Sequence, residues 1–129
     1  MLTQALKNAA SGASQTFVVC DNQEVVGYYA LATGSVTRQQ APGNIRRRMP
    51  ESIPIIVLGR LAVDFRWQGA GIGSGLLKDA VTRSLSVAQQ VGVRALLVNT
   101  LDEKAKGFYT HQGFKESPID PMTLMLSLK

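Results

Sequence analysis

The feature that most constrains the fold is a glycine-rich loop that stands between an apolar run and a long helical pattern. The segment RWQGAGIG, residues 66–73, has three glycines at alternating positions. From Ile72 to Val91 apolar residues recur at helical spacing, and Gly92 predicts the end of this helix. The preceding run PIIVLGRLAVDF, residues 54–65, suits a central strand that is covered on both faces. The chain must therefore pass from a buried strand through this loop into a helix.

Such a loop is able to bind phosphate. The start of a helix leaves backbone N–H groups without partners and carries the positive end of the helix dipole, while glycines bring a ligand close to the main chain. A Walker P-loop is excluded, because no Lys followed by Ser or Thr comes after the last glycine. The dinucleotide fingerprint matches poorly, since Ser74 stands where its third glycine belongs. Close packing of the helix, without a ligand, stays open as an alternative.

The flanking segments predict an α/β sandwich around one mixed sheet, within a single domain of 129 residues. The predicted elements are a short helix over 2–10 closed by Ser11 and Gly12, strands over 16–20 and 25–36 that form a hairpin around Asp21 and Asn22, a strand over 94–101, a helix over 102–112 ended by Gly113, and a strand over 123–128. Residues 37–53 hold two prolines and four arginines and are expected to form a surface excursion.

Charge and composition narrow the class of protein without naming a partner. The net charge of +5, from fourteen Lys and Arg against nine Asp and Glu, favours an anionic partner such as a nucleotide cofactor, a nucleic acid or an acidic protein. No apolar stretch approaches the roughly 20 residues of a membrane-spanning helix, and the N-terminus does not resemble a signal peptide. We therefore expect a cytoplasmic protein without a membrane association. Cys20 is the single cysteine and is expected to be a buried strand thiol.

Two longer motifs carry a family resemblance. LAVDFRWQGAGIGSGLL resembles motif A of the GNAT (Gcn5-related N-acetyltransferase) superfamily, with Arg66, Gly69 and Gly71 in its three defined places. LLVNTLDEKAKGFYTHQGF is similar to motif B, and together the two cover residues 54–114. More narrowly, TFVVC, GYYALATGSV, RRRMPESIPIIVLGRLAVD and AKGFYTHQGF resemble the TacT and AtaT group of acetyltransferase toxins from type II toxin–antitoxin modules.

The resemblance implies both a fold and a function. Residues 1–129 are expected to be one GNAT domain, with a mostly antiparallel mixed sheet, helices on both faces, and an N-terminal strand and helix region that is missing or shortened. The implied reaction moves an acetyl group from acetyl-CoA to the amino group of an aminoacyl-tRNA, which blocks translation. A ribbon-helix-helix antitoxin and a homodimer are the implied partners. The alternatives are acetylation of a small amine or a protein N-terminus, and a non-catalytic form that binds acetyl-CoA or an antitoxin.

The resemblance also implies a cofactor site. The pyrophosphate of acetyl-CoA is expected on backbone N–H groups from Gln68 to Ser74, with Arg66 or Lys78 near the adenosine-side phosphates. The pantetheine arm is expected along the main chain of residues 61–63. Asn99 offers a polar side chain to the pantetheine or the substrate, and a helix-capping role for Asn99 stays open. The implied cofactor-binding set is Leu61, Ala62, Val63, Arg66, Gln68, Gly69, Ala70, Gly71, Ile72, Gly73, Ser74 and Asn99.

Tyr109 falls at the family position whose phenol protonates the departing thiolate of coenzyme A. A phenol with a pKa of about 10 is neutral near pH 7 and can serve as that acid, although a core aromatic is the alternative interpretation. No general base is evident: Glu51 lies in a loop, and Asp64 is expected to pair with Arg60 or to cap a turn. An α-amino group, with a pKa of about 7.7 to 8.0, needs little help to lose its proton.

Four arginines cluster in the excursion at 37–53 and are candidates for the RNA contacts that a toxin of this group would need. Arg38, Arg46, Arg47 and Arg48 could follow the phosphate backbone of a transfer RNA. A solvated run of charges is the alternative, and the residues themselves do not decide between the two. No metal site is predicted.

Overall fold

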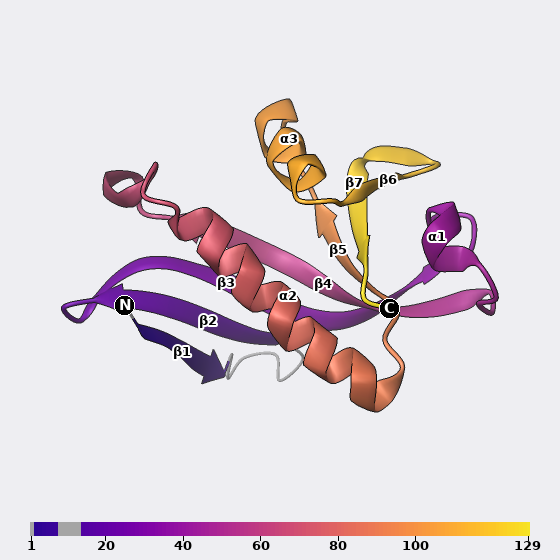
Figure 1. The fold of residues 1–129 in the computed structure, drawn as a ribbon, viewed down its shortest axis with the longest axis horizontal. Coiled ribbons are helices and arrows are strands. Elements are labelled where there is room, and N and C mark those ends of the chain that lie inside the picture. Colours follow the sequence, from indigo (N-terminus) through magenta and orange to yellow (C-terminus); the bar gives the residue numbers. More distant parts are fainter. Residues whose placement is uncertain (1, 8–13) are drawn as a thin grey trace. The chain divides into compact units, whose positions relative to one another are not determined.

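A computed structural model describes the backbone of residues 2–7 and 14–129 and the side chains from residue 14 onward (Figure 1). The elements follow in the order β1 (Leu2–Lys7), β2 (Ser14–Asp21), β3 (Glu24–Thr37), α1 (Gly43–Arg46), β4 (Ser52–Val63), the 3₁₀ turn η1 (Phe65–Trp67), α2 (Ile72–Val91), β5 (Ala95–Asn99), α3 (Glu103–His111), β6 (Lys115–Ser117) and β7 (Asp120–Ser127). The strands and helices therefore alternate in the second half of the chain, as the sequence predicts.

The described strands form one sheet in the order β1-β2-β3-β4-β5-β7-β6. The pairs β1–β2, β2–β3, β5–β7 and β6–β7 are antiparallel. The α/β fold class and the mostly antiparallel sheet are thus confirmed. The hairpin between β2 and β3 is also where the sequence places it: Asp21 is opposite Glu24, and the two turn residues Asn22 and Gln23 have φ angles of 50° and 66°. Positive φ at both central residues is the geometry that closes a two-residue hairpin.

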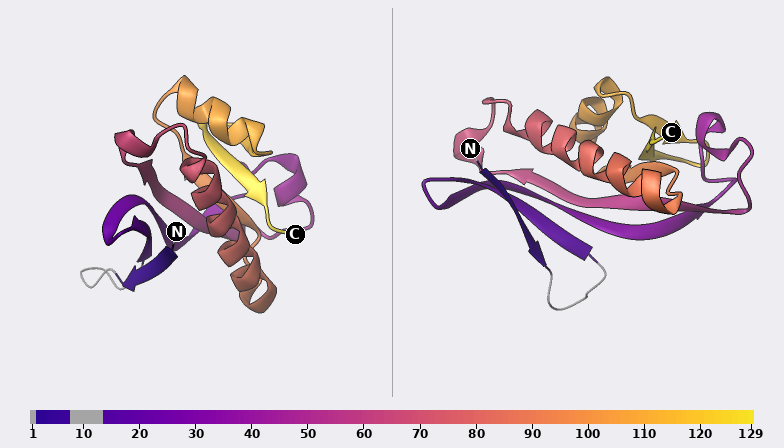
Figure 2. Two further views of the ribbon diagram at one scale, coloured as in Figure 1. Left: turned by 60° about the vertical axis from the view of Figure 1, so that its left-hand side comes forward. Right: turned by 60° about the horizontal axis from the view of Figure 1, so that its bottom comes forward.

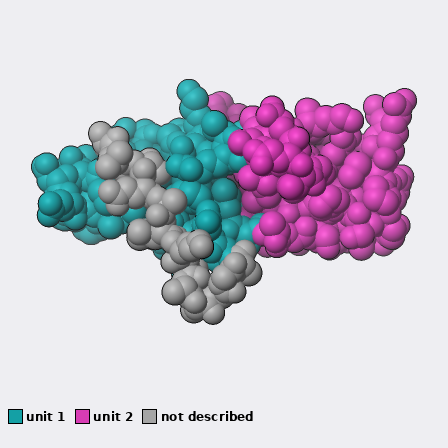
Figure 3. Space-filling model, turned by 90° about the horizontal axis from the view of Figure 1, so that it is seen from below, with its two compact units in different colours: residues 1–32, 58–83 teal, residues 33–57, 84–129 magenta. Residues whose placement is uncertain are grey.

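The chain divides into two compact units, coloured separately in Figure 3. Unit 1 consists of residues 1–32 and 58–83, and unit 2 consists of residues 33–57 and 84–129. The glycine loop and the first half of α2 belong to unit 1. The basic excursion, β5, α3 and β7 belong to unit 2. Each unit is described by itself below.

In unit 1 the first half of α2 packs on β3 and on the end of β4, as Figures 1 and 2 both show. The approach is close at Gly27, where a Cβ atom would lie 2.9 Å from Cδ1 of Leu76 and 3.1 Å from the carbonyl oxygen of Ala62. A larger residue would force the side chain of Leu76 to move and would press on the backbone of Ala62. Gly27 therefore allows α2 to pack closely on the sheet.

A cluster of four side chains, two from α2 and one each from β2 and β3, ties the helix to these strands. The hydroxyl of Tyr29 donates a hydrogen bond to the carboxylate of Asp79, and Nε of Arg83 lies 3.0 Å from the same carboxylate. The guanidinium of Arg83 covers the ring of Phe17 at 4.3 Å, and Phe17 stacks on Tyr29 with ring centroids 5.0 Å apart. Burial, the hydrogen bond to Asp79 and its negative charge raise the pKa of Tyr29, so that this phenol stays neutral.

The core of unit 2 gathers under α1. Ile45 of α1 is fully buried among Ile53 and Ile55 of β4, Leu97 of β5 and Met125 of β7. The expectation that residues 37–53 form only a surface excursion is therefore wrong in part. A four-residue helix inserts Ile45 into the core, and Ala41 is also fully buried. An apolar side chain in a charged loop is easily missed, because one residue shows no periodicity.

The predicted helix over 2–10 is also wrong. Residues 2–7 form strand β1, with Leu2 opposite Cys20 and Lys7 opposite Gln15, while residues 8–13 lie outside the described structure. Isolated helices of this length are marginal, whereas β2 presents a full row of backbone groups for pairing. An edge pairing of this kind depends on a partner strand that local sequence does not reveal. Cys20 itself is a free thiol and is half-buried rather than fully buried.

Two further expectations need correction. The helical spacing of apolar residues from Ile72 to Val91 places Leu85 and Val91 on the apolar face of the helix, yet they are 39% and 67% exposed, while Ser84 is fully buried. The buried face of α2 includes Ile72, Leu76, Leu77 and Ala80, so it is strongest in the first half of the helix. The short strand β6 was not predicted; its three residues pair with β7, which is also three residues longer at its start than the sequence indicates.

Candidate functional site

Asp64 anchors the chain where β4 ends. Its backbone N–H donates to the carbonyl of Val26 on β3 at 2.8 Å, and its Oδ1 accepts the backbone N–H of Arg66 at 2.9 Å. The carboxylate therefore caps η1, which is one of the two roles expected for it. The other expectation, an ion pair with Arg60, is wrong, because Asp64 pairs with Arg66. Hydrogen bonds from Arg66 lower the pKa of Asp64. A carboxylate held in its ionised form in this way is a weak general base.

The loop between η1 and α2 is an open cradle of backbone donors. Gly69 and Gly71 have φ angles of 87° and 80°, a left-handed conformation that favours glycine, and a Cβ atom on either would meet nothing within 4 Å. The N–H of Gly75 donates to the carbonyl of Gly71 at 3.1 Å and begins the hydrogen bonding of α2. Two of the N–H groups from Gln68 to Ser74 are already used, because Gln68 donates to Phe65 and Ala70 to Trp67, each at 3.3 Å.

The remaining N–H groups of the loop are free to meet a ligand. Within the described structure those of Gly69, Gly71, Ile72, Gly73 and Ser74 have no acceptor. Ile72 is buried, so the start of the helix, where three of these donors lie, is held by packing. Converging backbone donors with the positive end of a helix dipole suit a pyrophosphate. The residues present therefore fit the phosphate-bearing cofactor that the sequence predicts.

Arg66 lies beside this loop but is occupied by two carboxylates. Its Nη2 is 2.6 Å from Oε1 of Glu24 and 3.1 Å from Oδ2 of Asp64. The hydrogen bonds to Asp64 and Glu24 raise the pKa of Arg66, which is 53% exposed. The other cation considered for the cofactor phosphates, Lys78, is exposed and forms no ion pair within the described part of the chain. Of the two, Lys78 is the cation without a competing partner.

The predicted pantetheine segment is the last part of β4. Leu61, Ala62 and Val63 are half-buried, and their main-chain groups end the strand just before η1. The carbonyl of Val63 accepts a long hydrogen bond from the side chain of Gln68 at 3.4 Å. The side chain of Gln68 therefore folds back over the strand end, next to the loop that its own backbone begins.

The two remaining predicted site residues lie in unit 2: Asn99 at the end of β5 and Tyr109 in α3. Asp102 caps α3 by accepting the N–H of Ala105 at 2.8 Å, so the capping alternative for Asn99 is wrong. Asn99 ends β5, is exposed, and contacts the hydroxyl of Thr123 on β7 instead. Asn99 is therefore available to a ligand in unit 2, because Asp102 caps α3 in its place.

Tyr109 lies on the buried side of α3. Its ring is 7% exposed and meets Phe108 and Phe114 edge to face, with ring centroids 5.0 and 5.3 Å apart. Burial raises the pKa of Tyr109 to about 12. Its hydroxyl has no hydrogen-bond partner among the residues that the structure describes. Tyr109 thus combines a packed ring with a phenol that keeps its proton across the physiological range.

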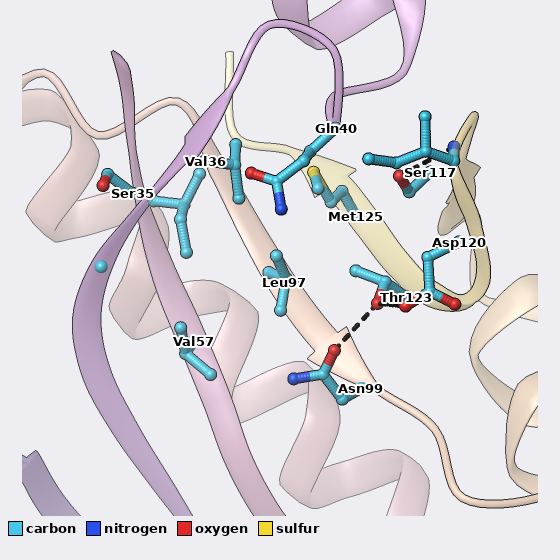
Figure 4. Close-up of a pocket in the computed structure, with 13 residues that line it drawn as sticks. Ser35, Val36, Gln40, Val57, Leu97, Asn99, Ser117, Asp120, Thr123 and Met125 are labelled. Atoms are coloured by element: carbon cyan, nitrogen blue, oxygen red, sulfur yellow. Dashed lines mark hydrogen bonds between the residues drawn. The ribbon is translucent and has the colours of Figure 1, made fainter.

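A hollow of about 450 Å³ opens in unit 2 on the face of β3, β4, β5 and β7 (Figure 4). Its apolar wall includes Val57, Leu97 and Met125, and its polar side is formed by Asn99 and Thr123 with Asp120. Sequence reasoning identified only Asn99 among these residues. The alternation along each strand could have placed the others on one face, but the pairing of β5 with β7 was needed to bring them together.

The four predicted RNA-binding arginines take two different roles. Nη1 of Arg38 donates to the carbonyl of Arg46 at 3.0 Å and also to that of Met49, so Arg38 braces the excursion from within. Arg46, Arg47 and Arg48 are exposed and follow one another at the end of α1. A fifth arginine that the sequence did not single out, Arg94, donates to the carbonyl of Ile45 at 3.3 Å. Both bracing arginines bind backbone carbonyls near the end of α1.

The comparison with family models decides which group of proteins these features belong to. Residues 12–116 match the model described as an acetyltransferase (GNAT) domain. The chain belongs to the GNAT acetyltransferase family. The match includes the glycine loop, and the acetyltransferase class is thereby confirmed. No helix among the described residues of this GNAT domain is long and apolar enough to cross a membrane.

Individual relatives narrow the resemblance to a group of toxins. The GNAT domain is 50% identical over 126 residues to a tRNA-acetylating toxin of Mycobacterium tuberculosis (strain ATCC 25618 / H37Rv), which covers 98% of this chain and 76% of that protein. The structure of AtaT complexed with acetyl-methionyl-tRNAfMet matches it with a TM-score of 0.86 at 29% identity, over 94% of this chain and 75% of AtaT.

A second solved structure resembles the domain and contains a cofactor. A tyrosine-to-phenylalanine mutant of AtaT, bound to the C-terminus of the antitoxin AtaR and to acetyl-CoA, matches with a TM-score of 0.74 at 29% identity, over 89% of this chain and 68% of that one. The predicted resemblance to the toxin group is thus confirmed. The individual site residues stay predictions, because none of these comparisons tests them.

Proposed function

We propose that this GNAT domain, residues 1–129, is a toxin that transfers an acetyl group from acetyl-CoA to the amino group of an aminoacyl-tRNA. The observation that carries the proposal is the similarity along nearly the whole chain to a tRNA-acetylating toxin. The free backbone donors of the glycine loop and the exposed arginines of unit 2 are consistent with a nucleotide cofactor and an RNA acceptor.

The cofactor would be held mainly by the backbone. The N–H groups of Gly69, Gly71, Ile72, Gly73 and Ser74 would take the pyrophosphate, and the main chain of residues 61–63 would meet the pantetheine arm. Acetyl-CoA supplies the acetyl group as a reactive thioester. Lys78 and, after rearrangement of its two ion pairs, Arg66 would add positive charge for the other phosphate. Gln68 and Ala70 contribute the shape of the loop, since their N–H groups are used within it.

Tyr109 would act as the proton donor. A phenol whose pKa is raised to about 12 is protonated at any physiological pH, so its proton is available in essentially every molecule. The same rise in pKa makes Tyr109 a weaker acid than a free tyrosine. Proton donation therefore requires that negative charge develops close to the hydroxyl, where a hydrogen bond to the charged partner lowers the cost of transfer.

The acceptor amine needs no strong base in this site. Asp64 is held ionised by Arg66, with a pKa below its ordinary value, so it attracts protons only weakly. An aminoacyl ester has an amino group with a pKa near or below about 8, and much of it is neutral at cellular pH. The absence of a strong base among the predicted residues therefore agrees with an aminoacyl acceptor better than with a lysine side chain.

The acceptor RNA would meet the exposed arginines at the end of α1. Arg46, Arg47 and Arg48 present three cations in succession, and the braces from Arg38 and Arg94 hold their backbone in place. Phosphate contacts of this kind position an RNA without reading its sequence. We further propose a cytoplasmic protein that is a homodimer and is neutralised by a ribbon-helix-helix antitoxin, as the resemblance implies.

The deciding experiment incubates the purified chain with acetyl-CoA and with total charged tRNA, and detects acetylated aminoacyl-adenosine by mass spectrometry. Uncharged tRNA serves as the control, because it offers no α-amino group. We expect acetylation of a subset of charged tRNAs only. If small amines or peptide N-termini are acetylated while every charged tRNA is refused, the alternative GNAT activity is correct. Binding of acetyl-CoA without transfer to any acceptor would instead support the non-catalytic alternative.

A further inference from the structure

Three polar side chains meet at one side of the hollow in unit 2 (Figure 4). Oγ1 of Thr123 lies 2.9 Å from the side-chain amide of Asn99, at the position drawn as Oδ1, and 2.8 Å from Oδ2 of Asp120. Oδ1 of Asp120 accepts the backbone N–H of Met122 at 3.0 Å. Asn99 comes from β5, whereas Thr123 and Asp120 come from β7.

The number of available hydrogen atoms restricts which hydrogen bonds these three side chains can form. The hydroxyl of Thr123 has one hydrogen, so it cannot donate to both Asn99 and Asp120. An ionised carboxylate has no hydrogen to give and must accept from Thr123. Asp120 is ionised at neutral pH, because hydrogen bonds from Thr123 and from the backbone of Met122 lower its pKa. Thr123 therefore donates to Asp120, and its oxygen is left to accept.

The only remaining arrangement exchanges the positions of the side-chain nitrogen and oxygen of Asn99. If Thr123 Oγ1 accepts, then Asn99 must donate, which places its NH₂ group toward Thr123 and its oxygen on the other side. Nitrogen and oxygen of an amide have nearly the same shape, so the hydrogen-bond network decides which is which. In Figure 4 the amide atom that does not face Thr123 points into the hollow, toward the side where Val57 and Leu97 lie. After the exchange this atom is Oδ1.

We infer that Thr123 and Asp120 are positioning residues that hold the carbonyl oxygen of Asn99 toward the hollow, where it accepts a hydrogen bond from the amino group of the acceptor. This inference rests on the proposed function and names the part of unit 2 that orients the acceptor. The relay runs from Met122 N–H and Thr123 O–H to Asp120, and from Asn99 N–H to Thr123.

An amide oxygen suits the task better than a charged group. A neutral amine can give one N–H to Asn99 and keep its lone pair free for attack on the acetyl carbon. A carboxylate in the same place would favour the protonated ammonium, which has no lone pair to offer. The hollow also has an apolar lining of Val57, Leu97 and Met125, which suits the rest of an amino acid. The role of Asn99 is thus orientation of the amine rather than removal of its proton.

The test compares Thr123→Val with Thr123→Ser in steady-state kinetics. Valine has nearly the shape of threonine but neither accepts nor donates, so the amide of Asn99 loses its orientation. We expect Thr123→Val to raise KM for the charged tRNA about five- to tenfold, with KM for acetyl-CoA unchanged. Thr123→Ser keeps the hydroxyl and should restore KM for the charged tRNA to within about twofold of wild type.

A second measurement reports the orientation directly and does not depend on activity. The side-chain NH₂ resonances of Asn99 in a ¹⁵N-labelled sample should show protection from exchange in wild type and in Thr123→Ser, and lose it in Thr123→Val. An unchanged KM for the charged tRNA in Thr123→Val, equal increases in both KM values, or unprotected Asn99 NH₂ protons in wild type would each overturn the inference.

The proposed function fails by a different outcome. If wild type acetylates no charged tRNA, the acceptor assignment is wrong, whatever the Thr123 variants do. The variants are then measured with the amine that wild type does accept, and the same rise in KM for that amine is expected. The NMR comparison holds in either case.

Discussion

Arg66 and Glu24 form an ion pair that joins η1, which follows β4, to the first residue of β3, with Nη2 and Oε1 2.6 Å apart. Both side chains are more than half exposed, and Arg66 also pairs with Asp64. The sequence predicts Arg66 as a cofactor-binding residue, yet its charge is paired with two carboxylates. A phosphate must compete with Glu24 for this guanidinium, and the competition determines how much Arg66 adds to cofactor binding.

We therefore expect Glu24→Gln to lower KM for acetyl-CoA, by at most about fivefold, because an exposed ion pair contributes little. Glu51→Gln is the matched control, since it removes the same charge from a residue that forms no ion pair with Arg66 in the described structure, and it should leave this KM unchanged. Steady-state kinetics at low ionic strength provide the measurement. Equal KM values in wild type and Glu24→Gln would mean that backbone donors and Lys78 hold the phosphates without Arg66.

The glycines of the loop should differ sharply from a glycine of the helix behind it. Gly71→Ala forces alanine into a φ angle of 80°, which costs about 1–2 kcal/mol and should weaken acetyl-CoA binding about tenfold through a changed loop. Gly75→Ala has open space and an ordinary helical φ, so it should stabilise the fold by about 0.5–1 kcal/mol. Isothermal titration calorimetry and urea unfolding separate the two effects. Tight cofactor binding by Gly71→Ala would rule out the backbone cradle.

Tyr109→Phe should abolish most turnover while leaving the fold intact. The ring contacts with Phe108 and Phe114 are kept, whereas the proton of the phenol is lost. We expect kcat to fall at least a hundredfold, within the usual range for a general acid, with little change in the dissociation constant of acetyl-CoA. Single-turnover acetylation provides the measurement. Turnover within tenfold of wild type would assign Tyr109 to the core alone.

The raised pKa of Tyr109 also predicts an alkaline change in stability. Its pKa is about 12 in the folded chain and about 10 when unfolded, so the folded state holds the proton more tightly. The resulting contribution is fully present below pH 10 and is lost as the pH rises toward 12. Wild type should lose about 2–3 kcal/mol more than Tyr109→Phe over this window, as measured by urea unfolding. Identical alkaline losses would show that the phenol is not buried in solution.

Tyr29 and Tyr28 are neighbours on β3 and offer a matched test of the cluster under α2. Tyr29 is fully buried and donates to Asp79, whereas Tyr28 is half-buried and its hydroxyl has no partner among the described residues. Tyr29→Phe should therefore destabilise the fold by about 1–2 kcal/mol, because it leaves the Asp79 carboxylate with Arg83 alone. Tyr28→Phe should change the unfolding free energy by less than about 0.5 kcal/mol. Equal effects of the two variants would contradict the role of the Tyr29 hydrogen bond.

The exposed arginines and their brace should respond differently to salt. Arg47→Gln removes one exposed cation and should reduce the slope of log K against log salt for tRNA binding by about 1. Arg38 donates to the carbonyls of Arg46 and Met49, so Arg38→Gln should disturb the whole run and reduce the slope by more than 1. Filter binding between about 50 and 200 mM salt gives both slopes. An unchanged slope in Arg47→Gln would favour a solvated run of charges over an RNA contact.

Local signals were sufficient for the loop, the helix behind it and the β2–β3 hairpin. Helical spacing from Ile72, the left-handed glycines and the acidic cap before α3 act within a few residues, so the chain displays them without its tertiary contacts. The family motifs extend this local information, which is why the GNAT fold and the acetyltransferase class could be predicted. The same motifs point to Tyr109 and to the loop donors as site residues, and these await their tests.

Non-local pairing decided the rest. Residues 2–7 became a strand because β2 offered an edge, Ile45 entered the core from a charged loop, and Arg38 turned inward to backbone carbonyls. Asn99 was known to end a strand, but its partner Thr123 lies 24 residues away and meets it only because β5 pairs with β7. Local sequence was enough to predict most helices and strands, but not β1 or β6. Only the tertiary structure determined which groups face one another, because hydrogen bonds and burial depend on neighbours that are distant along the chain.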